Sequence, residues 1–198
     1  GWRRATQAWP APGARRAGTG GPIRDVYHEP LTFVVGTQDP AHTFLNRLVA
    51  ARWAHPAGWI VDYPIVDDVD VTDAMIEERC LVLVGPPASN AVHARIGERL
   101  PIRVTEEGIR VGDEVHRGGQ VGTVFVAPNP LNPERSVLVI AGPSPLGTWR
   151  STELPDILPD YVVFDERVAP ARDEWACGGT GCAYRAHGFF DMRWRLRE

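Results

Sequence analysis

The segment "PNPLNPERSVLVIAG", residues 128–142, joins a proline-rich turn to the apolar run from Ser136 to Ala141. A short apolar run of this kind is typical of a strand that is buried on both faces of a sheet. Asn129 and Asn132 can bond their own backbone, and the prolines stiffen the turn. We therefore expect a structural turn that leads into a central strand. The alternative is a loop whose asparagines contact a ligand.

Strand-like runs alternate with helical segments on both sides of this stretch. We expect extended segments at residues 31–37, 58–68, 80–85 and 160–166, and helices at 38–54, 71–79, 89–100 and from 144 onward. The expected helix N-caps are Asp39, Thr72, Ser89 or Asn90, and Ser144. This order predicts a flavodoxin-like α/β three-layer sandwich with a mostly parallel sheet and a β-hairpin insertion near residues 102–126.

Composition and charge narrow the possible functions. The 198 residues are 43% hydrophobic, which is typical of one domain with a substantial core. A net charge of −4 gives no electrostatic reason to expect nucleic acid as a partner. No apolar stretch approaches the ~20 residues of a membrane span. We expect no nucleic acid partner, no membrane span and no cofactor.

Three regions differ in composition. Residues 1–22 are rich in glycine, alanine, proline and arginine, and we expect a flexible arm or linker that follows another domain. Residues 23–166 carry the strand and helix pattern and form the α/β domain. Residues 167–198 are expected to be a C-terminal extension with a cysteine loop and a final strand.

Four phrases carry a family resemblance, at residues 21–37, 67–102, 128–142 and 158–166. In this order they resemble the accessory domain that follows the α/β-hydrolase domain in secreted prolyl-oligopeptidase-like proteins of environmental bacteria. A more distant likeness is to prokaryotic surface-layer domains. The resemblance implies a non-catalytic accessory or interaction domain of an exported α/β-hydrolase of the peptidase or esterase type. Its partner would be a hydrolase domain or a cell-surface protein, in an extracellular or periplasmic location.

Candidate catalytic residues do not form a known motif. The nucleophile elbow G-x-S-x-G of α/β-hydrolases is missing, and prolines flank Ser144 in the nearest match, "GPSPLG". We therefore expect no catalytic residue in this chain. The alternative function is a small-ligand-binding domain or an independent enzyme that uses the carboxyl edge of the sheet. Its ligand-binding candidates are Thr37, His42, Ser89, Asn90, His93, Asn129, Asn132 and Ser144.

The cysteine pair near the C-terminus is the other chemical signal. Cys177 and Cys182 enclose "GGTG", a loop that is short and pliable enough for a disulfide to form in an exported protein. Free thiols, or a metal site that includes His187, are the alternatives, although no fourth metal ligand stands at a suitable spacing. We expect no metal at the acidic segment around Asp67, Asp68, Asp70 and Asp73, which reads as a solvated loop.

Overall fold

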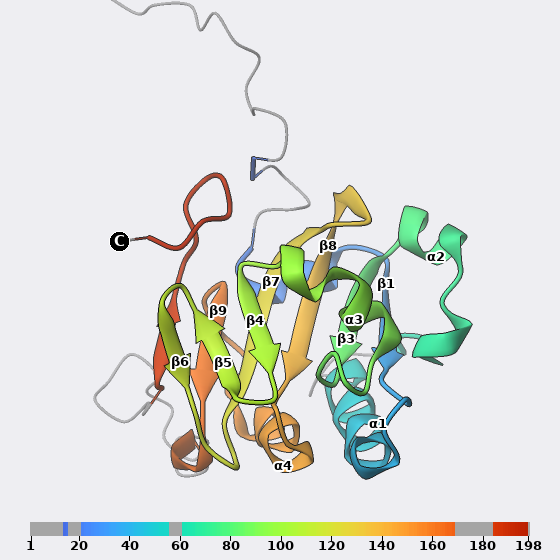
Figure 1. The fold of residues 1–198 in the computed structure, drawn as a ribbon. Helices are drawn as coiled ribbons and strands as arrows, with labels where there is room; N and C mark the ends of the chain where they lie inside the picture. The colour runs from blue at the N-terminus through green and yellow to red at the C-terminus, as the bar shows by residue number, and fades with distance from the viewer. Residues whose placement is uncertain (1–13, 16–20, 56–60, 169–183, 198) are drawn as a thin grey trace, which may run out of the picture.

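The structure is a computed structural model, and it describes residues 14–15, 21–55, 61–168 and 184–197 (Figure 1). A seven-stranded sheet runs through the centre in the order β10-β9-β7-β8-β3-β1-β2. Its strands are β1 (Leu31–Val35), β2 (Ile65–Asp67), β3 (Cys80–Val84), β7 (Gly122–Asn129), β8 (Asn132–Ala141), β9 (Tyr161–Phe164) and β10 (Ala186–Gly188).

The main sheet is mixed, so the prediction of a mostly parallel flavodoxin-like sandwich is wrong. β1 pairs in parallel with β2 and β3, and β3 pairs in parallel with β8. β7 runs antiparallel to both β8 and β9, and β10 runs antiparallel to β9. The physical reason is the tight turn at Pro130 and Leu131, because so short a connection between two strands permits only a hairpin.

A second, three-stranded antiparallel sheet replaces the expected hairpin insertion. It contains β4 (Ile102–Thr105), β5 (Gly108–Val111) and β6 (Glu114–His116) in that order. The insertion therefore ends near residue 116, and β7 belongs to the main sheet. Gly108, at φ 151°, permits the close approach of β5 to β6, because a Cβ there would lie 2.4 Å from the carbonyl oxygen of His116.

The helices begin where the sequence predicts caps. They are α1 (Pro40–Ala54), α2 (Asp73–Glu78), α3 (Ala91–Ile96) and α4 (Pro145–Trp149), with 3-10 helices η1 (Ile23–His28), η2 (Asp68–Asp70), η3 (Gly97–Arg99) and η4 (Arg150–Glu153). The predicted caps Asp39, Thr72 and Ser144 are confirmed, since each side chain accepts a backbone N–H of the first turn. Of the two candidates before α3, Asn90 is the cap.

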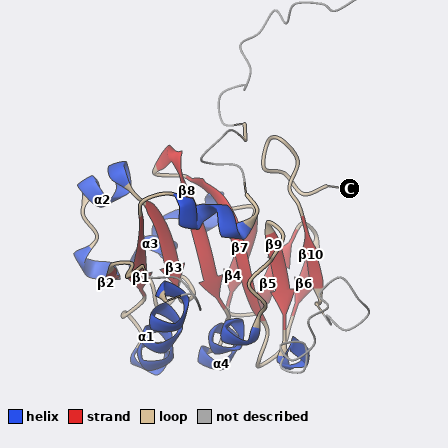
Figure 2. Ribbon diagram, turned by 180° about the vertical axis from the view of Figure 1, so that it is seen from behind, coloured by secondary structure: helices blue, strands red, loops and turns tan. Residues whose placement is uncertain are grey.

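The main sheet lies between two layers. The small sheet and α3 lie in front of it in Figure 1, and the reverse view in Figure 2 shows α1 and α4 nearer the viewer, beside the lower ends of the strands. The middle of the sheet is largely apolar and buried; its largest side chains include Phe33, Leu83, Phe125, Leu138, Ile140 and Phe164. Within the described ranges, no helix combines the length and the hydropathy that crossing a bilayer would need.

Candidate functional site

Polar residues gather where β1 and β3 end. Val35 and Val84, the last residues of these parallel strands, are register partners, so the segments that follow them leave the sheet side by side. Ser89, Asn90 and His93 reach this edge from the start of α3, and all three are completely buried. Four of the predicted ligand-binding residues, these three and Thr37, therefore belong to one cluster at the carboxyl edge.

Both polar atoms of the Asn90 side chain form hydrogen bonds with the backbone. Its Oδ1 accepts from the N–H groups of Val92 at 3.1 Å and His93 at 3.0 Å. Its Nδ2 donates to the carbonyl oxygens of Val34 at 3.0 Å and Val84 at 3.2 Å. The side chain thus fastens the start of α3 to both strands, and none of its polar atoms remains for a ligand.

Asn46 and Ser89 connect α1 to the same edge. The Nδ2 group of Asn46 donates to the carbonyl oxygen of Gly36 at 2.9 Å and to the Oγ of Ser89 at 3.2 Å. The Ser89 hydroxyl in turn donates to the carbonyl oxygen of Pro86 at 3.3 Å. Asn46 was not among the predicted site residues. The available signal was a polar residue one turn before the apolar pair Val49 and Ala50, on the face of α1 that is buried.

Asp68 closes the cluster from the side of η2. Its Oδ1 accepts from the backbone N–H of Thr37 at 3.1 Å and from the Thr37 hydroxyl at 2.6 Å. Its Oδ2 accepts from the side chain of Gln38 at 3.0 Å and from the N–H of Ala91 at 2.6 Å. Asp68 is buried, while Asp70 and Asp73 are exposed, so this member of the acidic segment is not solvated as predicted.

Gly85 shows how tightly this edge is filled. Its backbone has φ 109°, and a Cβ at this position would lie 2.5 Å from the Oγ of Ser89 and 2.6 Å from the Nδ2 of Asn46. Contacts this short leave no room for an added methyl group. The carboxyl edge at β1 and β3 is therefore packed with the protein's own side chains.

The two histidines near this edge are both shifted toward the neutral form. Burial lowers the pKa of His93 to about 4, although the hydrogen bond with the carbonyl oxygen of Gly85 opposes this shift. The His93 Nδ1 lies 2.9 Å from that oxygen, so Nδ1 carries the proton and Nε2 faces the interior without a partner. Burial also lowers the pKa of His42, against the charge of Asp39. Neither ring has the carboxylate partner at hydrogen-bonding distance that a catalytic pair requires.

The remaining candidates each organise a turn or a helix start. Asn129 Oδ1 accepts from the N–H of Leu131 at 3.0 Å, and Asn132 Nδ2 donates to carbonyl oxygens at the end of α2. Ser144 caps α4 and donates to the carbonyl oxygen of Gly119 at 2.6 Å. The turn between β7 and β8 lies at the opposite end of β8 from the edge cluster, so Asn129 and Asn132 do not converge with it. Ser144 follows the carboxyl end of β8, which is parallel to β3, but its hydroxyl is engaged by Gly119 and Gly147.

The cysteines offer no site within the described ranges. Cys177 and Cys182 lie outside the described residues, so the predicted disulfide stays a prediction. Cys80 is buried at the start of β3, and burial raises the pKa of its thiol, which keeps it protonated and unreactive. Over the residues that the structure describes, no group of three histidine, cysteine or acidic side chains is placed to hold a metal ion.

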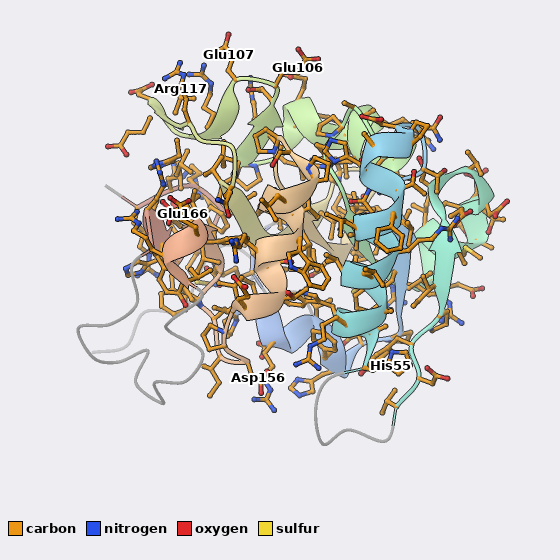
Figure 3. All side chains as sticks on the ribbon, turned by 90° about the horizontal axis from the view of Figure 1, so that it is seen from below. His55, Glu106, Glu107, Arg117, Asp156 and Glu166 are labelled. Carbon is orange, nitrogen blue, oxygen red and sulfur yellow. The ribbon has the colours of Figure 1, made fainter. Side chains whose placement is uncertain are left out.

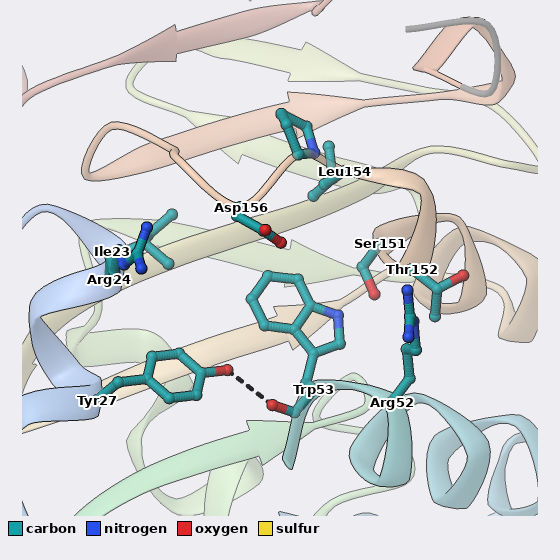
Figure 4. A pocket seen from close by; sticks show the side chains of 10 residues that line it. Ile23, Arg24, Tyr27, Arg52, Trp53, Ser151, Thr152, Leu154 and Asp156 are labelled. Carbon is teal, nitrogen blue, oxygen red and sulfur yellow. Dashed lines mark hydrogen bonds between the residues drawn. The ribbon is translucent and has the colours of Figure 1, made fainter. Parts of the chain in front are cut away.

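A pocket of about 100 Å³ opens between η1, the end of α1 and the segment that starts at η4 (Figure 4). We call it the Trp53 pocket. Its apolar lining comes from Ile23, Tyr27, Trp53, Leu154 and Pro155, and its polar lining from Arg24, Arg52, Ser151, Thr152 and Asp156. The Tyr27 hydroxyl donates to the carbonyl oxygen of Trp53 at 3.0 Å, which holds η1 against the last turn of α1.

The Trp53 pocket combines an aromatic wall with a charged rim. Figure 4 shows Asp156 above the indole ring of Trp53 and the guanidinium group of Arg52 to its right. The Ser151 hydroxyl is buried and has no hydrogen-bond partner, so an incoming polar group could bond to it. Burial raises the pKa of Tyr27, so its hydroxyl remains a donor. The pocket suits a flat or apolar group with a polar end.

Comparisons with known proteins add no family assignment to this geometry. A scan against family models and a search of the curated proteins both find no match to the chain.

Proposed function

We propose that this chain is a non-catalytic accessory domain that binds an α/β-hydrolase domain of the peptidase or esterase type, in an exported protein. The observation that supports it most is the closed carboxyl edge. Ser89, Asn90 and His93 are completely buried there and are bonded to the protein's own backbone. In open α/β sheets this edge is the usual ligand position, and a filled edge favours an interaction domain over an enzyme or a small-ligand receptor.

The outer side of the α1–α4 layer offers a surface for the partner. Phe44 is 69% exposed and Leu48 is 41% exposed on successive turns of α1, and Arg52 follows at the same spacing on the rim of the Trp53 pocket. Leu146 of the adjoining α4 is exposed as well. Single exposed apolar residues are ordinary, but a row that leads to a pocket is typical of a protein–protein contact.

The Trp53 pocket is the proposed anchor point on this surface. Figure 3 looks onto the α1–α4 layer and labels His55, just after α1, and Asp156 at the same end of that layer. An apolar side chain of the partner would enter beside Trp53, and the exposed Ile157 next to Asp156 would extend the contact. Aromatic pockets with a charged rim commonly provide the central anchor of an interface.

The test measures binding of this chain to a G-x-S-x-G hydrolase domain from the same organism by isothermal titration calorimetry. We expect Phe44→Asp and Leu48→Asp each to weaken binding by about tenfold or more, because a charge would be buried without a partner. Phe189→Asp is the matched control. Phe189 is 50% exposed beside β10, at the far side of the sheet from α1, and its replacement should leave binding unchanged.

Hydrolytic assays of the isolated chain test the enzymatic alternative. We expect no turnover of generic esters or peptide anilides. Turnover that Ser89→Ala or Ser144→Ala abolishes, with the circular dichroism spectrum intact, would establish a catalytic function and contradict the proposal.

A further inference from the structure

A second cavity, of about 500 Å³, lies at the opposite end of the main sheet from α1 and α4. Its walls come from three segments that are far apart in the chain: residues within 98–103, residues within 127–133, and residues 193–194. We call it the Asn129 cavity. None of the edge-cluster residues or Trp53-pocket residues lines it, so its chemistry is independent of the partner surface proposed above.

Two buried N–H donors in its lining have no acceptor. Asn129 is completely buried, and because its Oδ1 accepts from the N–H of Leu131 at 3.0 Å, the other side-chain atom must be the amide nitrogen. That Nδ2 has no partner, and neither has the indole Nε1 of Trp194. Buried donors without acceptors are costly and rare in native proteins. Two of them in one cavity lining indicate an acceptor-bearing ligand.

Trp194 has a strained backbone conformation. Trp194 has φ 61°, a conformation that bulky side chains seldom adopt. The guanidinium group of Arg15 lies 4.4 Å from its ring centroid, and the ring of Phe190 lies 6.2 Å away. These contacts accompany a backbone conformation that costs energy, and such strain is commonly retained at binding sites.

The charge around the cavity favours an anion. Arg99, Arg103 and Arg193 line it together with a single acidic residue, Glu98. Arg99 is held over the turn by a 3.1 Å bond from its Nη1 to the carbonyl oxygen of Pro130. Arg103 pairs with Glu98 at 3.0 Å, which leaves two arginine charges in excess. The walls between them are apolar, from Leu100, Pro101, Pro128 and Pro133.

From the unpaired donors, the excess arginine charge and the apolar walls, we propose that the Asn129 cavity binds a carboxylate carried on an apolar body. The carboxylate oxygens accept from Asn129 Nδ2 and Trp194 Nε1, and the arginines neutralise its charge. Both N–H groups are shielded from water, so the ligand must enter to the cavity wall and the two side chains must turn toward it. A free organic acid and the carboxylate of a peptide share this chemistry.

The experiment follows the Trp194 indole N–H signal by ¹⁵N NMR, with the signal assigned by Trp194→Phe. The probes are benzoate, its neutral analogue benzamide, and a short peptide whose one carboxylate is a glutamate side chain. We expect benzoate to shift the signal saturably and benzamide not to shift it. A saturable shift with benzoate alone identifies a free organic acid as the source, and a shift with the peptide as well extends the site to protein carboxylates.

Asn129→Asp is the decisive variant. It keeps the oxygen that accepts from Leu131, so the turn is retained, but it replaces the free donor by a charge that repels the ligand. We expect the Kd for benzoate to rise by about tenfold or more. Arg193→Gln should weaken binding several-fold. Its matched control is Arg110→Gln, an exposed arginine of β5 that lines neither pocket, which should bind benzoate normally.

Three results would overturn the proposal. The first is the absence of a saturable shift with both benzoate and the peptide, and the second is an equal response to benzamide. The third is an Asn129→Asp protein that gives a wild-type spectrum elsewhere and binds benzoate with unchanged affinity.

Discussion

Asp68 joins three segments of the chain through one buried carboxylate. Its oxygens accept from Thr37, Gln38 and Ala91. Asp68→Asn should lower the free energy of unfolding by on the order of 2 kcal/mol, because one acceptor oxygen becomes a donor that faces other donors. Urea denaturation measures the change. Asp70→Asn, an exposed neighbour in η2, is the control and should be nearly neutral; equal losses in both variants would refute this role of Asp68.

His93 should make stability depend on pH. Its pKa is about 4 in the folded protein, because of burial, against 6.5 when exposed. Between these values the unfolded chain binds a proton that the folded chain does not. Stability from this group is therefore full above pH 6.5 and falls as pH drops toward 4, by on the order of 3 kcal/mol. Urea titrations from pH 7.5 to 4.5 should show this slope, and His93→Gln should reduce it.

His55 provides a control of opposite sign. It is exposed, and the hydrogen bond with the Ala51 carbonyl oxygen, together with Asp62, raises its pKa. Any stability that it contributes is present at low pH and is lost as pH rises through its folded pKa. His55→Gln should therefore not reduce the slope attributed to His93. A His93→Gln protein with the wild-type pH dependence would contradict the assignment.

The sequence predicted the location of the polar residues at the carboxyl edge but not their structural role. Thr37, Ser89, Asn90 and His93 do come together, because parallel strands β1 and β3 end at one edge. Asparagine is common both as a helix cap and as a ligand contact, so the identity of Asn90 in the sequence does not distinguish the two roles. Its bonds to Val34 and Val84 depend on tertiary distance, which no local pattern records.

The side chain of Asn132 connects the β7–β8 hairpin to the end of α2. Asn132 Nδ2 donates to the carbonyl oxygens of Ile76 and Glu77, and its Oδ1 accepts from the N–H of Glu134. Asn132→Ala should cost about 1–2 kcal/mol of unfolding free energy, measured by thermal and urea denaturation. Asn132→Asp keeps the acceptor but turns a carboxylate oxygen toward the two carbonyl oxygens of α2, so it should lose at least as much stability as Asn132→Ala. No loss in either variant would mean that the connection is unimportant.

Helix starts were predictable and strand directions were not. The caps Asp39, Thr72 and Ser144 act through bonds to residues two or three places along, which makes them visible in the sequence. The apolar segments 122–127 and 136–141 have similar compositions, and composition does not show whether a strand is parallel or antiparallel to its neighbour in the sheet. The direction of β7 follows from the short turn after Asn129, a hairpin signal that the interpretation as a mostly parallel sheet overlooked.

The state of the cysteines reports on the compartment of the protein. We predict that Cys177 and Cys182 are oxidised to a disulfide while Cys80, which is buried, remains a thiol. The loop is short, so the bond should add only roughly 2 kcal/mol of stability. Intact-mass measurement after alkylation of the unfolded protein, with and without reduction, should show two additional reactive thiols after reduction. Alkylation of all three without reduction would contradict both the disulfide and the proposed export.

The two outermost strands of the main sheet also determine how the protein meets its neighbours. β2 and β10 have three residues each, whereas the central β8 has ten. Short edge strands expose few free N–H and C=O groups, so they give another chain little backbone to pair with and protect against edge-to-edge aggregation. Self-association by strand addition to these two edges of the main sheet is therefore disfavoured.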